Sequence, residues 1–100
     1  MRQAAITGWA KCAPDKVLSN DDLATLLDTN DEWITSRTGM KERRISPVPV
    51  SELSYIAAAR ALACAGVNAD DVDMIILGSC SFDSQVPNAA SRVQQLLQAN

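Results

Sequence analysis

The 100-residue sequence contains no histidine and no long apolar run, and only 4% of its residues are aromatic. Histidine is the commonest general base and the commonest metal ligand, so any catalysis either proceeds without it or uses residues outside this chain. The absence of a run of about 18 apolar residues excludes a membrane-spanning helix. Lys11, Asp15 and Lys16 interrupt any signal-peptide apolar region, so we expect a cytoplasmic protein.

Cysteine is also scarce, and its spacing matches no zinc site. Cys12, Cys64 and Cys80 form no CxxC motif, and an odd number leaves one of them unpaired. We therefore expect reduced thiols and no metal site. The formal net charge of −3 argues against general nucleic-acid binding. With 47% hydrophobic and 21% charged residues, the composition is that of a folded, soluble protein.

Basic residues gather in one short segment, which we call the basic cluster: Arg37, Lys41, Arg43 and Arg44, with Glu42 as the single acid among residues 37–44. The flanking sequence on both sides is acidic overall. A local excess of positive charge in an acidic chain indicates a site for an anion, such as a phosphate group.

Trp33 lies four residues before Arg37, which in a helix places both on one face. In one interpretation, Trp33 stacks on a base while Arg37 and the rest of the basic cluster bind phosphates. In the other, Trp33 packs on the core and Arg37 covers its ring as a cation–π neighbour. Spacing alone does not choose between them. An RNA-binding patch is a third interpretation, which the acidic flanks disfavour.

Hydrophobic periodicity and capping residues predict a sequence of short elements. Asn20 is expected to cap one helix, and Thr29 with Glu32 forms a possible capping box for the next, which Gly39 can close. The predicted elements, in order, are a strand at 4–8, a helix at 21–27, a helix at 31–38, an extended segment at 40–45, a helix at 52–65, a strand at 72–77 and a helix from about 88 onward.

This order of elements is that of an α/β protein with a parallel sheet. Only two strands are predicted with a clear pattern, and a two-stranded sheet is marginally stable even when helices cover it. We therefore expect residues 1–100 to be a piece of a larger domain, or to depend on partner chains.

Cys80 follows the strongest predicted strand, where ligands bind in open α/β sheets. It is either a nucleophile or, more simply, a small residue that lines a pocket, because the chain offers no histidine to activate a thiol. Cys64 lies in an alanine-rich helix, where a buried thiol acts as a small hydrophobe. The acid pairs Asp21/Asp22 and Asp70/Asp71 stand at predicted helix starts, and capping explains them.

Three contiguous stretches, residues 6–8, 14–23 and above all 28–45 (DTNDEWITSRTGMKERRI), resemble the N-terminal part of β-ketoacyl-acyl carrier protein synthase III. The alanine-rich helix, residues 71–77 and residues 87–90 continue the pattern in register. The resemblance covers essentially all of the chain and about the first third of a family member. It implies an α/β thiolase-like fold of layered αβαβα architecture, usually in a homodimer.

The resemblance also implies the initiating, decarboxylative Claisen condensation of fatty acid synthesis, with acyl-CoA and malonyl-acyl carrier protein as substrates and no separate cofactor. The family's catalytic Cys, His and Asn are expected beyond residue 100, so we expect this chain alone to be inactive. Secondary-metabolite relatives share the N-terminal pattern. A non-catalytic CoA-binding, acyl-binding or structural module is the alternative from another functional class.

Carried over by position, the resemblance implies that Thr29 hydrogen-bonds the adenine of CoA, Trp33 stacks on it and Arg37 contacts the CoA phosphates. Cys80 and Val86 are implied to line the acyl pocket, near the dimer interface. Val86 departs from the larger residue common at its position, which leaves the primer acyl group open. No nucleic-acid or membrane partner is implied.

Overall fold

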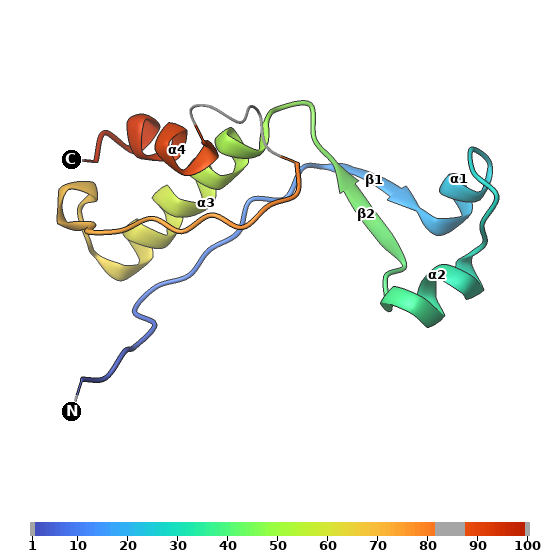
Figure 1. Cartoon of the computed structure of the whole chain (residues 1–100), viewed down its shortest axis with the longest axis horizontal. Coiled ribbons are helices and arrows are strands. Elements are labelled where there is room, and N and C mark those ends of the chain that lie inside the picture. The colour runs from blue at the N-terminus through green and yellow to red at the C-terminus, as the bar shows by residue number, and fades with distance from the viewer. Residues whose placement is uncertain (1, 82–87, 100) are drawn as a thin grey trace. The chain divides into compact units, whose positions relative to one another are not determined.

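The computed structural model describes residues 2–81 and 88–99, and these form two compact units (Figure 1). We call residues 13–47 the hairpin unit, and residues 2–12 together with 48–81 and 88–99 the helical unit. Ile34 is the buried apolar residue of the hairpin unit, whereas Ala89 and Val93 are buried in the helical unit. Each unit therefore has its own small core.

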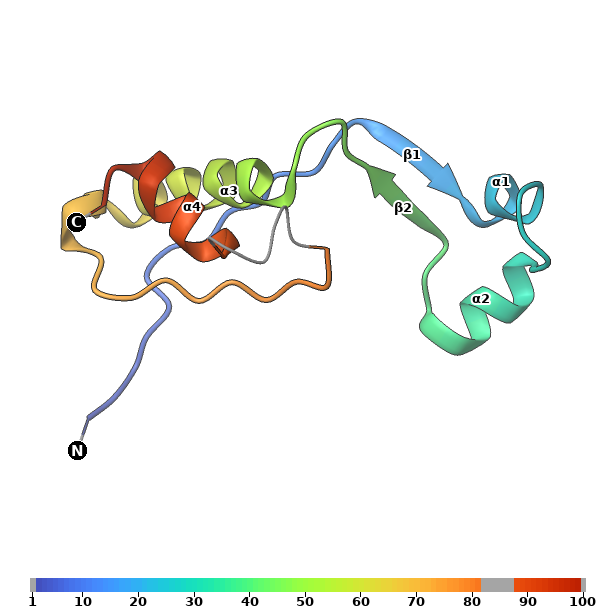
Figure 2. The ribbon, with the colours of Figure 1, turned by 45° about the horizontal axis from the view of Figure 1, so that its top comes forward.

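The hairpin unit places two short helices at one end of a two-stranded sheet (Figure 2). Its elements are β1 (Lys16–Ser19), α1 (Asn20–Ala24), α2 (Asp31–Thr38) and β2 (Glu42–Ile45). The strands are antiparallel, with Lys16 opposite Ile45 and Ser19 opposite Glu42. The extended segment predicted at 40–45 and the helix predicted at 31–38 are confirmed.

Both N-caps of the hairpin unit differ from the prediction by one residue. Ser19 caps α1 through a reciprocal box with Asp22, in which each backbone N–H donates to the other residue's side-chain oxygen at 3.1 Å. Asn30, not Thr29, caps α2, because its side-chain oxygen accepts from the backbone N–H of Trp33 at 2.8 Å. Asn20, the expected cap of α1, is already helical and is buried.

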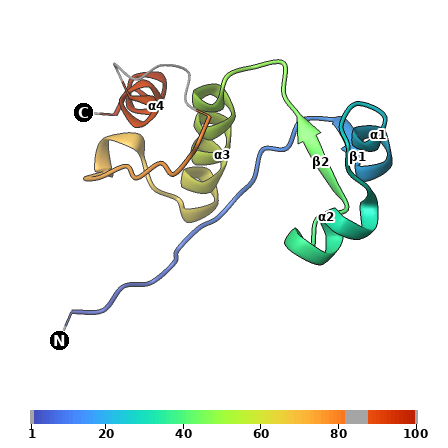
Figure 3. The ribbon, with the colours of Figure 1, turned by 45° about the vertical axis from the view of Figure 1, so that its right-hand side comes forward.

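The helical unit consists of two packed helices with extended chain beside them (Figures 1 and 3). Its elements are α3 (Val50–Ala65), the 3-10 turn η1 (Ala69–Asp71) and α4 (Ala89–Leu97). Gly66 ends α3 in the left-handed conformation, with φ 68°. Val93 of α4 is only 2% exposed, and Asn88 caps this helix through the N–H of Ser91.

The N-terminal segment crosses α3 at a glycine. A Cβ added to Gly8 would lie 2.6 Å from the carbonyl oxygen of Ala61 and 2.7 Å from the Cβ of Ala65. Such distances are too short for any real side chain, so the close approach requires glycine on one side and small residues on the other. The small side chains of this alanine-rich helix thus let another segment approach closely.

The prediction of strands at residues 4–8 and 72–77 is wrong. Residues 4–8 and 72–77 belong to no sheet among the described residues; the described sheet pairs β1 only with β2. A strand needs a hydrogen-bonding neighbour, and an apolar run cannot supply one by itself. Residues 72–77 instead run as unpaired chain beside α3 and α4, with Met74 76% exposed and Ile76 87% exposed.

Three residues of the predicted helices are exposed. Leu26 and Leu27, which fall in the helix predicted at 21–27, are 73% and 59% exposed, because α1 ends at Ala24 and a turn follows it. Cys64, expected to be buried, is exposed near the end of α3. Within residues 2–81 and 88–99, every helix is too short or too polar to cross a membrane.

Candidate functional site

The helix α2 presents Trp33 and Arg37 together on its surface. The guanidinium carbon of Arg37 lies 5.6 Å from the centroid of the Trp33 ring, within cation–π range. Trp33 nevertheless remains 55% exposed, so this contact covers only part of the ring. The shared face that the four-residue spacing predicts is confirmed, and its aromatic surface is open to a ligand.

A cavity of about 400 Å³ adjoins Trp33 in the hairpin unit. Four apolar side chains from α1, the following turn and α2 contribute to its walls, and Thr29 and Asn30 add polar atoms just before α2. Its lining residues are Leu23, Leu27, Asp28, Thr29, Asn30, Trp33 and Ile34. The structure therefore brings Thr29 and Trp33 together at one cavity, while Arg37 lies against the Trp33 ring.

Two members of the basic cluster bond to polar groups of the hairpin unit itself. The Nη2 of Arg43 donates to Oδ1 of Asn20 at 2.6 Å, and its Nη1 lies 3.4 Å from the carbonyl oxygen of Ser19. Arg44 donates to the carbonyl oxygen of Pro14 at 2.9 Å. These bonds go against the interpretation in which the whole basic cluster binds phosphates, because Arg43 and Arg44 already bond to groups of the hairpin unit.

Asn20 is the functional candidate that the sequence did not reveal. Its side chain is 1% exposed, and its Nδ2 donates to Oδ1 of Asp31 at 2.7 Å and to the carbonyl oxygen of Met40 at 2.8 Å. Asparagine at a strand–helix junction is typical of a cap, so nothing in the local pattern distinguishes this buried role. The one sequence feature connected with this role is the basic residue Arg43, but the sequence does not identify Asn20 as the partner of Arg43.

Asp31 is the first residue of α2, and its carboxylate accepts a hydrogen bond from the buried side chain of Asn20. Its Oδ1 also accepts a hydrogen bond from the hydroxyl of Thr35 at 3.1 Å. The hydrogen bonds from Asn20 and then Thr35, with a smaller contribution from the charge of Lys41, hold the pKa of Asp31 below its ordinary value of 3.8. The carboxylate therefore stays ionised, and able to accept these bonds, to a lower pH than an ordinary aspartate.

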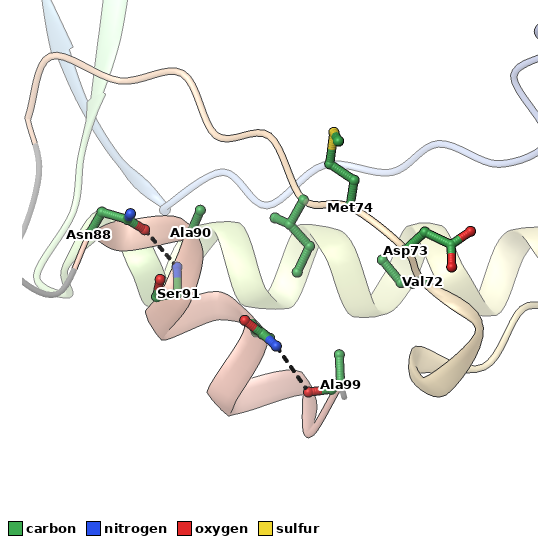
Figure 4. A pocket seen from close by; sticks show the side chains of 9 residues that line it. Val72, Asp73, Met74, Asn88, Ala90, Ser91 and Ala99 are labelled. Carbon is green, nitrogen blue, oxygen red and sulfur yellow. Dashed lines mark hydrogen bonds between the residues drawn. The ribbon is translucent and has the colours of Figure 1, made fainter.

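Of the two acyl-pocket residues implied by the resemblance, Cys80 is exposed and Val86 lies outside the described residues. A separate, polar hollow of about 240 Å³ lies between residues 72–75 and α4 (Figure 4). Among the described residues, no group of three or more Cys, Asp or Glu side chains could hold a metal ion.

Two polar side chains that line this hollow bond to backbone groups at the two ends of α4. Figure 4 shows the side chain of Asn88 turned toward the backbone N–H of Ser91, at 2.8 Å, and a side-chain amide bonded to the carbonyl oxygen of Ala99. Met74 points away from the helix in the same view and is mostly exposed. These bonds cap the ends of α4 and leave no convergent set of free polar groups in the hollow.

Comparison with known proteins gives a consistent result, although no family model matches the chain. It is 60% identical over 94 residues to a β-ketoacyl-[acyl-carrier-protein] synthase III 2 of Vibrio cholerae, which is 94% of this chain and 26% of that protein. The crystal structure of 3-oxoacyl-[acyl-carrier-protein] synthase III from Aquifex aeolicus matches 93% of this chain and 30% of its own, with a TM-score of 0.81 and 39% identity.

A third match comes from polyketide synthesis. The priming β-ketosynthase of the R1128 polyketide pathway matches 95% of this chain at a TM-score of 0.80 and 27% identity, again over 30% of its own length. These neighbours confirm a thiolase-like α/β fold, of which the described elements are one part. The chain is therefore homologous, over nearly all of its residues, to a segment spanning about a quarter to a third of β-ketoacyl-[acyl-carrier-protein] synthase III.

Proposed function

We propose that this chain is the CoA-binding N-terminal part of an initiating condensing enzyme. The observation that carries the proposal is the half-exposed Trp33 ring, which borders a cavity shared with Thr29 and lies against Arg37. A flat aromatic surface beside a guanidinium suits a nucleotide, whose base stacks and whose phosphates pair with the cation. Acyl-CoA is then the first substrate, Thr29 bonds its adenine, and no separate cofactor is needed.

The proposed reaction proceeds through an acyl-cysteine intermediate. A cysteine thiolate attacks the acyl-CoA thioester and releases CoA. Malonyl-acyl carrier protein then loses CO₂, and the resulting carbanion attacks the acyl-cysteine to form the β-ketoacyl product and free the thiolate. The resemblance implies that the catalytic Cys, His and Asn lie beyond residue 100, and residues 1–100 contain no histidine, so we expect residues 1–100 alone to be inactive.

A secondary-metabolite condensing enzyme is the second candidate, supported by the match to the R1128 priming ketosynthase. This second candidate would differ from a fatty acid synthesis enzyme in the acyl acceptor that it uses, and not in the CoA-binding face. For either candidate we propose a cytoplasmic homodimer in which Cys80 and Val86 line the acyl pocket. Reading the coding sequence past Asn100 tests both: a Cys soon after it and a distant His and Asn are expected, and a stop codon there rules out catalysis by this chain.

The CoA-binding face is tested by Trp33→Ala in the complete protein. We expect KM for acyl-CoA to rise roughly tenfold, because loss of one base-stacking surface removes about 1–3 kcal/mol of binding. The KM for malonyl-acyl carrier protein is expected to change less than twofold. Steady-state kinetics with each substrate varied in turn provide the measurement.

The matched control is Trp9→Ala, because Trp9 is a second exposed tryptophan, 76% exposed, in the helical unit. It is expected to leave both KM values unchanged. Equal increases in both KM values for Trp33→Ala would show that Trp33 serves only the fold. If neither KM value changes for Trp33→Ala, the proposal that α2 forms part of the substrate site is wrong.

A further inference from the structure

The side-chain amide of Asn20 forms hydrogen bonds with groups from α2, from β2 and from the chain that connects them. Its Nδ2 bonds Asp31 at 2.7 Å and the Met40 carbonyl at 2.8 Å, and its Oδ1 accepts from Arg43 at 2.6 Å. Its backbone N–H also donates to the carbonyl oxygen of Lys41 at 3.1 Å. At 1% exposure, water cannot replace any of these partners, so each bond fixes a position.

These bonds connect both ends of the helix that carries the binding face. Asp31 is the first residue of α2, and Met40 follows Gly39, the left-handed residue that ends it. A single nitrogen atom thus holds the start of α2 and the chain just past its end. Arg43 connects the same amide to β2, with a further contact to the carbonyl oxygen of Ser19 at the end of β1.

We propose that Asn20 is a positioning residue for acyl-CoA binding, an inference that rests on the proposed function of the Trp33–Arg37 face. The amide of Asn20 fixes the rotation and translation of α2 relative to the β1–β2 sheet. Trp33 and Arg37, which do not contact Asn20 through any described hydrogen bond, are presented to the ligand by that placement. Arg43 acts with Asn20 and not as a phosphate ligand.

Asn20→Asp in the complete protein tests this role, because the variant keeps the size of the side chain. It replaces the Nδ2 donor by an oxygen, which faces the carboxylate of Asp31 and the carbonyl of Met40 and repels both. We expect KM for acyl-CoA to rise roughly five- to tenfold. The kcat at saturating acyl-CoA and the KM for malonyl-acyl carrier protein are expected to stay within about twofold.

The exchange Asn20→Asp with Asp31→Asn provides the rescue. It reverses donor and acceptor between positions 20 and 31 and keeps an acceptor for Arg43, so we expect KM to recover most of the way. The bond to Met40 is not restored, and a residual rise of about twofold is expected. Asp21→Asn, in the exposed first turn of α1, is the matched control for a nearby change of charge, and no change in KM is expected.

The outcomes separate this inference from the proposed function. If Trp33→Ala raises KM and Asn20→Asp does not, the positioning role fails while the binding face stands. If Trp33→Ala changes nothing, the binding face itself fails. An increase with Asn20→Asp that the exchange does not reverse, or that appears equally in kcat and in both KM values, overturns the positioning role. If Asn20→Asp does not fold, Arg43→Lys tests a bond to the same amide. We again expect KM for acyl-CoA to rise while kcat and the KM for malonyl-acyl carrier protein stay within about twofold. No rise, or an equal change in kcat and both KM values, overturns the positioning role.

Discussion

The carboxylate of Asp31 is stabilised by two side chains on one oxygen, Asn20 at 2.7 Å and Thr35 at 3.1 Å. Because these bonds lower the pKa of Asp31 in the folded state, they stabilise the fold when this group is ionised. The contribution is fully present above the ordinary value of 3.8. It is lost as the pH falls below 3.8 through the lowered folded-state pKa.

Replacing Asn20 by Ala is expected to raise the pKa of Asp31 toward 3.8, because the largest of the lowering interactions is removed. A ¹³C NMR titration of the side-chain carboxyl measures this. Asp22 is the internal reference: the backbone and then the hydroxyl of Ser19 lower its pKa, so it should keep its low value. A parallel rise at Asp22 would indicate loss of the whole hairpin unit, and an unchanged Asp31 would contradict the assigned cause.

For single residues, the kind of residue that caps or ends a helix was predictable from the sequence, but which residue serves as the N-cap was not. Gly39 was expected to end α2 with positive φ, and it does so at 74°. The caps were displaced by one position, from Asn20 to Ser19 and from Thr29 to Asn30, because neighbouring residues have equivalent cap chemistry. Which of them becomes the cap depends on tertiary contacts. Asn20 is buried and bonds to Arg43 and Asp31, and the local sequence pattern does not predict these contacts.

Among the elements, the crossing of the N-terminal segment and α3 sets the tightest steric requirement. Gly8 meets the backbone of Ala61 and the side chain of Ala65, and backbone atoms cannot turn aside as a flexible side chain can. The alanine-rich composition of α3 made close approach predictable from the sequence. The partner segment was not predictable, since residues 4–8 were expected to pair in a sheet rather than to pack singly on a helix.

Gly8→Ala is therefore expected to destabilise the protein by about 1–3 kcal/mol through overpacking. Gly78→Ala is the matched control, because a Cβ there meets nothing within 4 Å and the backbone has no positive φ. Thermal midpoints of the two variants, made in the complete protein and compared with the parent, measure the difference. Equal midpoints for Gly8→Ala and Gly78→Ala would show that the segment moves away from α3 without loss.

For the whole molecule, the described residues bury little apolar surface. The buried apolar residues are Ile34, Ala89 and Val93, while Ile6 and Trp9 are 89% and 76% exposed. The α/β class was predictable because it depends on the order of elements, and its structural neighbours confirm it. Strand pairing was not, because the parallel sheet expected from the sequence needs partners from distant sequence.

A chain limited to residues 1–100 is accordingly expected to unfold without cooperativity, since a core of this size cannot offset the conformational entropy of folding. Circular dichroism during heating, with the monomer verified by light scattering, measures this. A sharp, reversible thermal transition of the monomer would contradict it. The same segment within a complete synthase is expected to unfold together with the rest of the protein.

The unpaired chain at residues 72–77 has a practical consequence for anyone producing this segment by itself. Met74 and Ile76 are open to solvent, and the backbone groups beside them are free of any described ladder. An apolar, β-branched run in that state is a template for edge-to-edge association between copies. Recombinant yield will therefore be governed by self-association through this segment, and a charged substitution at Ile76, such as Ile76→Lys, is the first remedy for inclusion-body formation.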